Sequence, residues 1–165
     1  MFREMRRNKQ VMSSEKALDV LKNATSGVLA VSGDDDYPYA VPLSFVYNDG
    51  KIYFHSAREG HKVDAIRNND KASFCVISKD EIVPEEFTTY FRSVIAFGKI
   101  KIISDEAEIM ETLNMLALKY SRPDDDAGRK RVIESSLSNV LMMELDIEHL
   151  SGKEAIELVK NKENK

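Results

Sequence analysis

The sequence predicts a mainly β protein, a small antiparallel β-barrel of about six strands with flanking helices, formed as one domain by residues 1–165. Two observations lead to this fold class. Several short segments alternate apolar and polar residues and are separated by turn residues, which is typical of strands joined in hairpins. Other segments carry apolar residues at helical spacing. Successive antiparallel strands usually close or nearly close, because closure removes the unpaired edges of the sheet.

Composition and charge exclude several classes of protein. Hydrophobic residues make up 42% of the chain, charged residues 32%, and the net charge is −4. Because this balance offers no basic surface to displace counterions, binding to nucleic acid is not expected. No apolar run reaches the roughly 20 residues that span a bilayer, and no apolar signal segment opens the chain. We therefore expect a cytoplasmic protein without a membrane contact, whose basic arm, about residues 1–12, is solvated.

The first segments predict a helix followed by a strand. SSEKALDVLKNAT begins with serines suited to cap a helix. Its apolar residues follow at i, i+3, i+4 and i+7: Ala17, Val20, Leu21 and Ala24. SGVLAVS then predicts a short buried strand, and the acidic residues and proline of DDDYP predict a turn.

The next segment, YAVPLSFVYNDGKIYFHS, predicts a hairpin. Alternate positions in its first half are apolar: Val41, Leu43, Phe45 and Tyr47. The tripeptide NDG supplies the positive φ angles that a tight hairpin turn requires. Pro42 has no N–H for a strand ladder, so we expect its strand to be irregular or to lie at an edge.

The second half predicts two long elements and several short ones. GHKVDAIRNN is expected to be a short helix and KASFCVI a strand, while TTYFRSVIAFGKIKIIS is expected to be one long strand bent at Gly98. DEAEIMETLNMLALKYS predicts the strongest helix, capped by Asp105 and ended by RPDDDAG. A weaker helix, RKRVIESSL, precedes the last strand, NVLMMELDI. We expect the tail SGKEAIELVKNKENK to begin as a helix and to fray over about 155–165.

The stretch HSAREGHK, from His55 to Lys62, concentrates groups that bind anions. Ser56 ends a strand, Gly60 permits a close approach of the backbone, and Lys62 lies in the first turn of the next helix. A helix N-terminus presents free N–H groups, and a lysine placed there is mildly unfavourable unless an anion is near. The stretch therefore predicts a phosphate site. The open alternative is that these residues are simply solvated.

The sequence gives little support for a metal site, a reactive cysteine or a nucleotide-binding motif. His55 and His61 are separated by a loop with no cysteine nearby, so no metal site is expected. The single cysteine, Cys75, lies in an apolar run and is expected to be a buried, unreactive thiol. The glycine-rich motifs of dinucleotide and nucleoside triphosphate binding are absent from the chain, as is the nucleophile motif of α/β-hydrolases.

The order of the segments carries more information than any one of them. The series PYAVPLSF, IYFHSA, EGHK and YFRSVIAFG resembles the FMN-binding split-barrel family related to pyridoxamine-5'-phosphate oxidase. Within that family it is similar to the branch of the 5-nitroimidazole reductases, the nitroimidazole-resistance proteins. The resemblance implies a six-stranded antiparallel split β-barrel of the FMN-binding type. It also implies a homodimer with FMN at the subunit interface.

The resemblance also implies a set of cofactor contacts. The segment VPLS would run beside the isoalloxazine ring through Val41, Pro42, Leu43 and Ser44. The segments FHSA and GHK would hold the phosphate and the ribityl chain through Phe54, His55, Ser56, His61 and Lys62. The segment TTYFRSV would approach the cofactor or the partner subunit through Tyr90, Arg92 and Ser93.

The activity that the resemblance implies is that of an FMN-dependent oxidoreductase. Electrons would pass from NADH or NADPH to a small acceptor such as a nitroaromatic, and His55 or His61 would donate a proton. One alternative is a flavin- or haem-binding carrier or sensor without turnover. Another is a pyridoxamine-5'-phosphate oxidase. The tail counts against the latter, since it contains no arginine where the dedicated oxidases carry a basic motif for the substrate phosphate.

Overall fold

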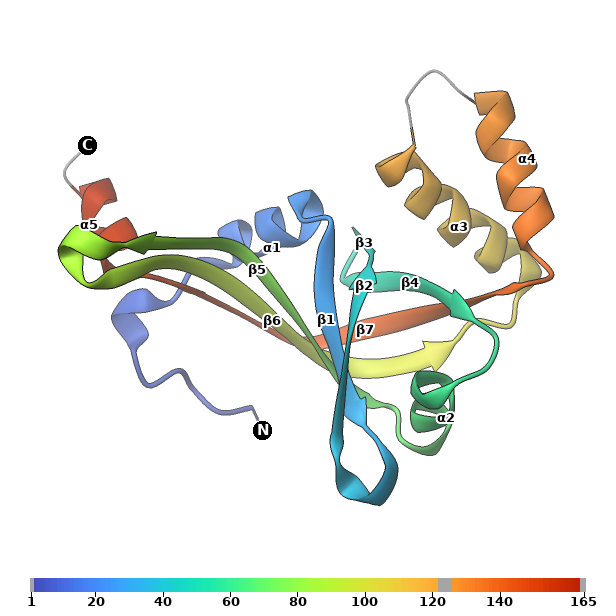
Figure 1. Cartoon of the computed structure of the whole chain (residues 1–165), viewed down its shortest axis with the longest axis horizontal. Helices are drawn as coiled ribbons and strands as arrows, with labels where there is room; N and C mark the ends of the chain where they lie inside the picture. Colours follow the sequence, from blue (N-terminus) through green and yellow to red (C-terminus); the bar gives the residue numbers. More distant parts are fainter. Residues whose placement is uncertain (1, 122–125, 164–165) are drawn as a thin grey trace.

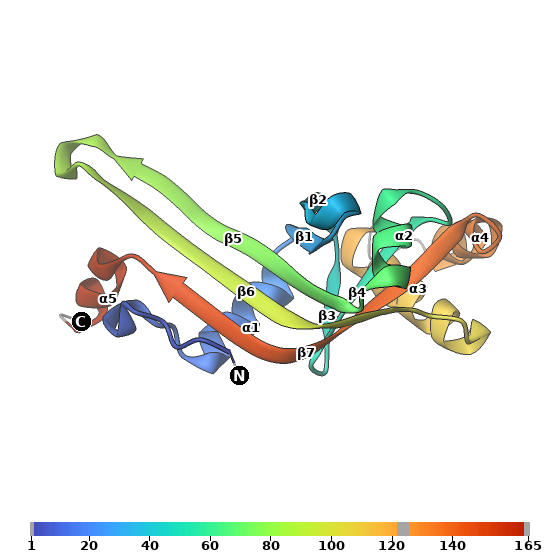
Figure 2. The ribbon, with the colours of Figure 1, turned by 90° about the horizontal axis from the view of Figure 1, so that it is seen from below.

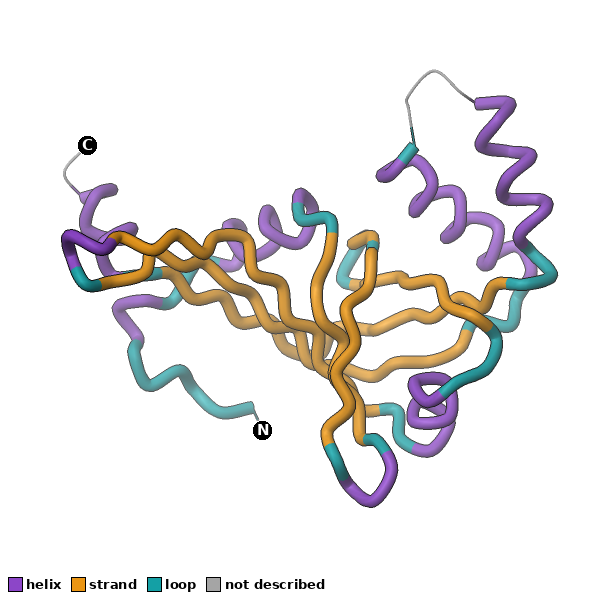
Figure 3. Tube along the Cα trace, in the orientation of Figure 1, coloured by secondary structure: helices purple, strands orange, loops and turns teal. Residues whose placement is uncertain are grey.

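The computed structural model describes residues 2–121 and 126–163. One antiparallel sheet of seven strands forms its body, in the order β2-β1-β5-β6-β7-β4-β3 (Figure 1). The strands are β1 (Ser26–Ser32), β2 (Pro38–Ser44), β3 (Val46–Asn48), β4 (Lys51–Ala57), β5 (Lys71–Val83), β6 (Thr88–Ile102) and β7 (Val140–Glu154). The helices are α1 (Ser14–Asn23), α2 (His61–Asn68), α3 (Glu106–Tyr120), α4 (Asp126–Ser136) and α5 (Ile156–Glu163), with short 3-10 turns at Asn8–Gln10, Asp34–Asp36 and Pro84–Glu86. The helices lie around the periphery of the strands (Figure 3).

The strand count differs from the predicted six because one predicted strand is broken at Phe45. β2 pairs with β1 along its whole length, and only β3 forms a hairpin with β4. The phenol oxygen of Tyr120 lies 2.9 Å from the backbone nitrogen of Phe45 and 2.8 Å from its carbonyl oxygen. At Phe45 the hydroxyl of Tyr120 thus takes the place of hydrogen bonds to a neighbouring strand. The prediction of one continuous hairpin is wrong for β2.

The sheet curls without closing through hydrogen bonds. Its two edge strands, β2 and β3, are joined by Phe45 alone, so the edges meet at one corner of the sheet. The open sheet agrees with the split barrel that the resemblance implies, whereas the nearly closed barrel expected from strand pairing alone is not formed. Pro42 lies on the edge strand β2, as predicted from its missing N–H.

Strands β5 and β6 form a long hairpin that extends away from the curled sheet (Figures 1 and 2). The predicted irregularity at Gly98 is confirmed, because the pairing of β6 with β7 shifts register there. A Cβ atom on Gly98 would lie 1.9 Å from the carbonyl oxygen of Asp146, so only glycine fits. The predicted bend therefore has a steric cause.

The last strand runs further than the sequence suggests. β7 continues to Glu154, where it pairs with Arg92 of β6, whereas the prediction ended it at Ile147. The residues from Ser151 to Glu154, predicted to start a helical tail, therefore belong to the strand, and α5 begins at Ile156. The long strand β6 provides hydrogen-bonding partners for these residues, and the local sequence does not reveal such distant partners. The tail predicted to fray over about 155–165 forms α5 as far as Glu163, and the last three residues of the predicted breaker RPDDDAG begin α4. Residues 122–125 and 164–165 lie outside the described residues.

Two apolar clusters stabilise the fold. The first fills the curled sheet, where Phe74 packs edge-on against Phe45 and Phe54 at 4.8 and 5.0 Å between ring centroids. The second joins α3 and α4 to β4 and β7 through residues such as Tyr53 and Met142. The predicted caps are confirmed, since the side chains of Ser13 and Asp105 accept hydrogen bonds in the first turns of α1 and α3.

Candidate functional site

The loop between β4 and α2 is open at the start of the helix. Gly60 has φ 124°, a backbone conformation that favours glycine, and a Cβ atom there would meet nothing within 4 Å. Its carbonyl accepts the N–H groups of Val63 at 2.8 Å and Asp64 at 3.2 Å. The N–H groups of His61 and Lys62 precede these first helical bonds and have no partner in the helix. This end of α2 therefore offers free donors beside open space.

Lys62 is the unpaired cation of this loop. Its side chain is half-buried in the first turn of α2, and within residues 2–121 and 126–163 it has neither an ion pair nor a hydrogen bond. Arg67, at the other end of the same helix, pairs with Asp64 at 3.4 Å. An ammonium group near the positive end of a helix dipole is unfavourable without a counter-ion. The arrangement therefore fits an anion.

The two histidines of the loop lie in different surroundings. The ring of His61 stacks on Tyr39 at 4.1 Å between centroids, and its Nε2 lies 3.6 Å from a carboxylate oxygen of Asp34. His61 therefore contacts the β1–β2 turn. His55 instead points outward from β4 into a cavity.

This cavity, called the α3–α4 cavity below, has a volume of about 400 Å³ and is mainly apolar. Helices α3 and α4 form most of its wall, and β4, the end of β2 and the start of β7 complete it. The residues that line it are Ser44, His55, Leu113, Leu116, Ala117, Tyr120, Val132, Ile133, Ser136 and Val140. A size of this order and an apolar lining with few polar groups are typical of small-molecule sites.

Strand alternation separates the predicted residues of β4. Phe54 and Ser56 point inward, whereas His55 points to solvent. Phe54 is 0% exposed and packs against Phe74, so its side chain belongs to the core and cannot reach a ligand in this structure. The hydroxyl of Ser56 is buried and donates to the carbonyl of Ala57 at 2.8 Å. Of these three residues of β4, His55 is the one that lines the cavity.

The predicted ring-binding segment lies on the edge strand β2. Val41 and Leu43 are half-buried and pack against the core, while Pro42 and Ser44 are exposed. Because β1 pairs with β2 on one side and no strand of the described residues pairs on the other, the outer backbone edge is open to a ligand. Ser44 ends this strand at the α3–α4 cavity.

The residues predicted on β6 lie elsewhere. Tyr90 donates a hydrogen bond to Glu86 at 2.8 Å, which raises the pKa of the tyrosine, and Arg92 pairs with Glu154 at 3.3 Å. Ser93 pairs with Ile77 of β5 on one side and with Lys153 of β7 on the other. All three predicted residues belong to the β5–β6 hairpin, which extends away from α2 and α4 (Figures 1 and 2). A single chain does not bring them to His55 or Lys62.

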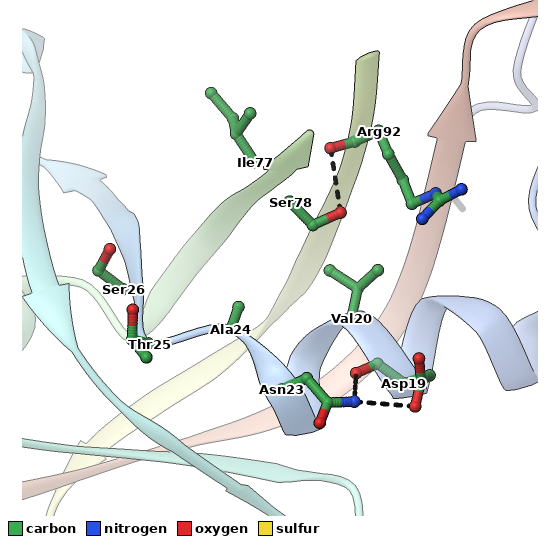
Figure 4. A pocket seen from close by; sticks show the side chains of 9 residues that line it. All are labelled: Asp19, Val20, Asn23, Ala24, Thr25, Ser26, Ile77, Ser78 and Arg92. Atoms are coloured by element: carbon green, nitrogen blue, oxygen red, sulfur yellow. Dashed lines mark hydrogen bonds between the residues drawn. The ribbon is translucent and has the colours of Figure 1, made fainter. Parts of the chain in front are cut away.

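A second cavity of about 390 Å³ lies at the base of that hairpin (Figure 4). Its lining is mixed, with Arg92, Ser78 and Asp19 among its polar side chains. The hydroxyl of Ser78 donates to the carbonyl of Arg92 at 3.4 Å. The guanidinium of Arg92 reaches Glu154, which also pairs with Lys16 at 3.5 Å. The guanidinium of Arg92 is thus paired with a carboxylate of its own chain, while the carboxylate of Asp19 accepts a hydrogen bond from the amide of Asn23.

Tyr120 and the helical wall of the α3–α4 cavity were not among the predicted site residues. Tyr120 lies near the end of the segment predicted as a helix, but the strands that this helix covers depend on the tertiary fold. Close by, Lys119 donates to the carbonyl of Ala24 at 2.5 Å and lies 4.2 Å from the ring centroid of Phe45. Burial lowers the pKa of Lys119. These two residues anchor the C-terminal end of α3 to the sheet.

Within the described ranges, no three His, Cys, Asp or Glu side chains come together as metal ligands would. Cys75 is half-buried, and burial raises the pKa of its thiol, which disfavours the reactive thiolate. None of the described helices combines the length and apolar character that a membrane crossing needs.

Comparisons with known proteins support the fold. A family model described as pyridoxamine 5'-phosphate oxidase matches residues 13–154. No sequence among curated proteins matches the chain.

Several solved structures share the fold. One is a candidate 5-nitroimidazole antibiotic resistance protein from Bacteroides thetaiotaomicron, with a TM-score of 0.73 and 20% identity over 87% of this chain and 85% of that one. The flavocytochrome Anf3 from Azotobacter vinelandii has a TM-score of 0.71 and 19% identity over 92% and 72%. An FAD-binding protein from Mesorhizobium loti has a TM-score of 0.65 and 22% identity over 88% and 97%. Because the matched family model covers residues 13–154, most of the chain, the chain belongs to the pyridoxamine 5'-phosphate oxidase family.

Proposed function

We propose that the chain is an FMN-dependent oxidoreductase that reduces a small acceptor, such as a nitroaromatic, with electrons from NADH or NADPH. The observation that carries the proposal is the half-buried, unpaired Lys62 at the open start of α2, next to a strand that leads into an apolar cavity. Neighbours of the same fold are described as FAD-binding, as a flavocytochrome and as a candidate nitroimidazole resistance protein, which supports a flavin here.

The residues present fit a flavin phosphate. The Lys62 ammonium and the N–H groups of His61 and Lys62 would bind the phosphate oxygens, since such donors suit a doubly charged oxyanion. Gly60 leaves the space in front of them open. FMN ends in this phosphate, and we therefore favour FMN over FAD.

The flat ring has a place along the open edge of β2. Backbone groups of Val41 to Ser44 would bind its polar atoms, and the apolar wall of the α3–α4 cavity would exclude water beside it. When bound, the flavin supplies the two-electron transfer, and the protein controls access and proton supply.

Of the two predicted histidines, His55 is better placed to donate a proton to the reduced acceptor. It lines the cavity, whereas His61 is stacked on Tyr39 and faces Asp34. A histidine suits this role because its ordinary pKa lies near neutrality. We assign proton donation to His55 and positioning of the β1–β2 turn to His61.

We also propose that the protein is a homodimer, because the β5–β6 hairpin, which carries the predicted contacts on β6, extends away from α3 and α4 of its own chain (Figure 1). Tyr90, Arg92 and Ser93 would then approach the cofactor bound by the partner subunit. Two-fold homodimers are the commonest soluble assemblies.

The test is steady-state oxidation of NADH and NADPH by the FMN-loaded protein with a panel of nitroaromatic acceptors. We expect turnover in the wild type, a kcat lower by about 10²-fold or more in His55→Ala, and near-normal kcat in His61→Ala, with flavin retained in all three. Full turnover by His55→Ala would contradict its assigned role. Absence of turnover with every acceptor would contradict the proposed oxidoreductase activity.

A flavin carrier or sensor is the second candidate. The observation that favours it is the sparse acid–base chemistry of the α3–α4 cavity, where His55 and Tyr120 are the titratable groups among the ten lining residues. Reversible flavin binding without turnover with any donor and acceptor pair would support this candidate.

A further inference from the structure

We infer that the tip of the β5–β6 hairpin, residues 80–87, docks on helix α4 of a second copy of this chain and covers the mouth of that copy's α3–α4 cavity. The inference rests on the homodimer of the proposed function and extends it by naming the surfaces that meet. It does not depend on which cofactor is bound.

The tip is apolar where a free surface would be polar. Phe87 is 98% exposed and directly follows the 3-10 turn Pro84–Glu86, and Ile82 beside it is 73% exposed. Phe87 also has φ 50°, a left-handed conformation that is unfavourable for a bulky residue. Holding an aromatic ring in water on a strained turn has a cost in the isolated chain. Burial against a partner would offset it.

The rim of the tip is acidic. Asp80 and Glu85 are exposed and form no ion pair within the described residues. The other two carboxylates are already engaged, because Glu81 pairs with Lys79 at 2.5 Å and Glu86 accepts a hydrogen bond from Tyr90. The tip therefore presents an apolar centre with uncompensated negative charge at its edge.

Helix α4 carries the complementary surface. Val132 is 64% exposed and lines the α3–α4 cavity. Next to it, Arg131 is exposed and forms no ion pair in the part of the chain that the structure describes, and Lys130 reaches Glu134 only at 3.9 Å. An apolar residue flanked by two cations matches an apolar tip flanked by two carboxylates. Such complementarity favours one partner and one orientation.

The positions of the two surfaces allow a closed dimer. The tip and α4 lie near opposite ends of the long axis of the molecule (Figure 1). A two-fold axis across that long axis would place each tip beside the α4 of the other copy, so both contacts form at once. Phe87 would then pack on Val132 at the mouth of the cavity that contains His55. Each active site would be incomplete without the partner's hairpin.

The first experiment is cross-linking of the full chain in a Cys75→Ser background. We expect Phe87→Cys combined with Val132→Cys to give a covalent dimer with a short bismaleimide, and neither single cysteine variant to do so. A covalent dimer from Phe87→Cys alone would mean that two tips meet, which overturns the proposal. No covalent dimer from the double variant would overturn it as well.

The second experiment is a charge exchange, measured as the dimer dissociation constant by analytical ultracentrifugation at low salt. Glu85→Lys and Arg131→Glu are each expected to weaken the dimer by about tenfold. Combining them should restore most of the lost affinity, because the exchanged charges can pair again. Additive weakening in the double variant would contradict the docking.

Flavin absorbance of the same variants separates the two proposals. Cross-linking without bound flavin would leave the docking standing and remove the proposed function. Flavin binding without cross-linking would remove the docking alone.

Discussion

The two ends of the molecule differ in the kind of group that lacks a partner. At the cavity end, formed by β4, α2, α3 and α4, the cation Lys62 is unpaired and an apolar cavity is open. At the arm end, the β5–β6 hairpin beyond Ile77, Arg92 has its carboxylate partner, while Phe87 is exposed to water. An unpaired charge beside a cavity suits a small anionic ligand, whereas an exposed apolar tip suits a protein surface. This difference underlies our proposals that a cofactor binds at the cavity end and a second subunit at the arm end.

The bend that separates the two ends should be the most sensitive point. Replacing Gly98 by valine puts a side chain where the Asp146 carbonyl lies, 1.9 Å from the Cβ position. We expect a loss of more than about 3 kcal/mol in the free energy of unfolding, measured by urea denaturation. Lys99→Ala, at the adjacent exposed position, is the control and should change little. A stable Gly98→Val protein would show that the β5–β6 hairpin and the curled sheet are not rigidly joined at this position.

A buried carboxylate holds the sheet together behind the cavity end. Glu144 is buried and binds Lys51 at 3.0 Å and Lys101 at 3.3 Å. Glu144→Gln is expected to cost about 1–3 kcal/mol of unfolding free energy, a range that allows for solvent screening of the two lysines. The exposed Glu148→Gln on the same strand is the matched control. Equal stability of both variants would mean that the lysines are fully solvated.

The same carboxylate predicts a pH dependence. Burial alone would raise the pKa of Glu144, but the hydrogen bonds from Lys51 and Lys101 outweigh it and hold the pKa below its ordinary value. Since the folded-state pKa is lowered, the stabilisation is complete above the unfolded value and is lost as the pH falls through the folded value. From about pH 5 to about pH 3, the wild type should lose more melting temperature than Glu144→Gln. Parallel curves would contradict the sign of this shift.

Local signals in the sequence predicted local structure well. The cap at Asp105 and the irregularity at Gly98 were predicted, because each depends on residues close along the chain. The break at Phe45 and the extension of β7 to Glu154 were not, because they depend on Tyr120 and on a distant partner strand.

The candidate site divides in the same way. His55 and Lys62 were predicted from one short stretch. In the structure His55 lines the α3–α4 cavity and Lys62 is half-buried at the start of α2, and their roles stay predictions. The resemblance also assigned Phe54 to the site, although strand alternation turns it into the core. The wall of α3 and α4 could not be predicted, since helical periodicity shows that a face is buried but not what covers it.

The anchoring of the β2–β3 corner gives a moderate effect. Tyr120→Phe removes the hydroxyl that lies within hydrogen-bond distance of Phe45 and of the Thr25 carbonyl. We expect a loss of about 1–2 kcal/mol by denaturant unfolding. Tyr90→Phe at the arm end should cost less, because its hydroxyl binds only the exposed Glu86. Equal losses would remove this contrast between the two ends.

The smallest effect on folding is expected at the tip. Phe87→Gly relieves the positive φ and removes a fully exposed ring, so the free energy of unfolding should change by less than about 0.5 kcal/mol under monomeric conditions. Dimer dissociation measured at several concentrations should nevertheless increase. Tyr37→Ala, an exposed aromatic in the β1–β2 turn, should leave the dimer unchanged. Equal dimerisation of Phe87→Gly and the wild type would contradict the role of the tip.

Titration with FMN, followed by quenching of flavin fluorescence, tests the cavity end most directly. The protein would be compared with Lys62→Ala and with Arg67→Ala, which removes a cation of the same helix that is already paired. We expect the wild type and Arg67→Ala to bind alike and Lys62→Ala to bind about 10- to 150-fold more weakly, the loss of one charge-assisted hydrogen bond. Equal affinity in all three proteins, or no binding by the wild type, would contradict a flavin phosphate at the start of α2.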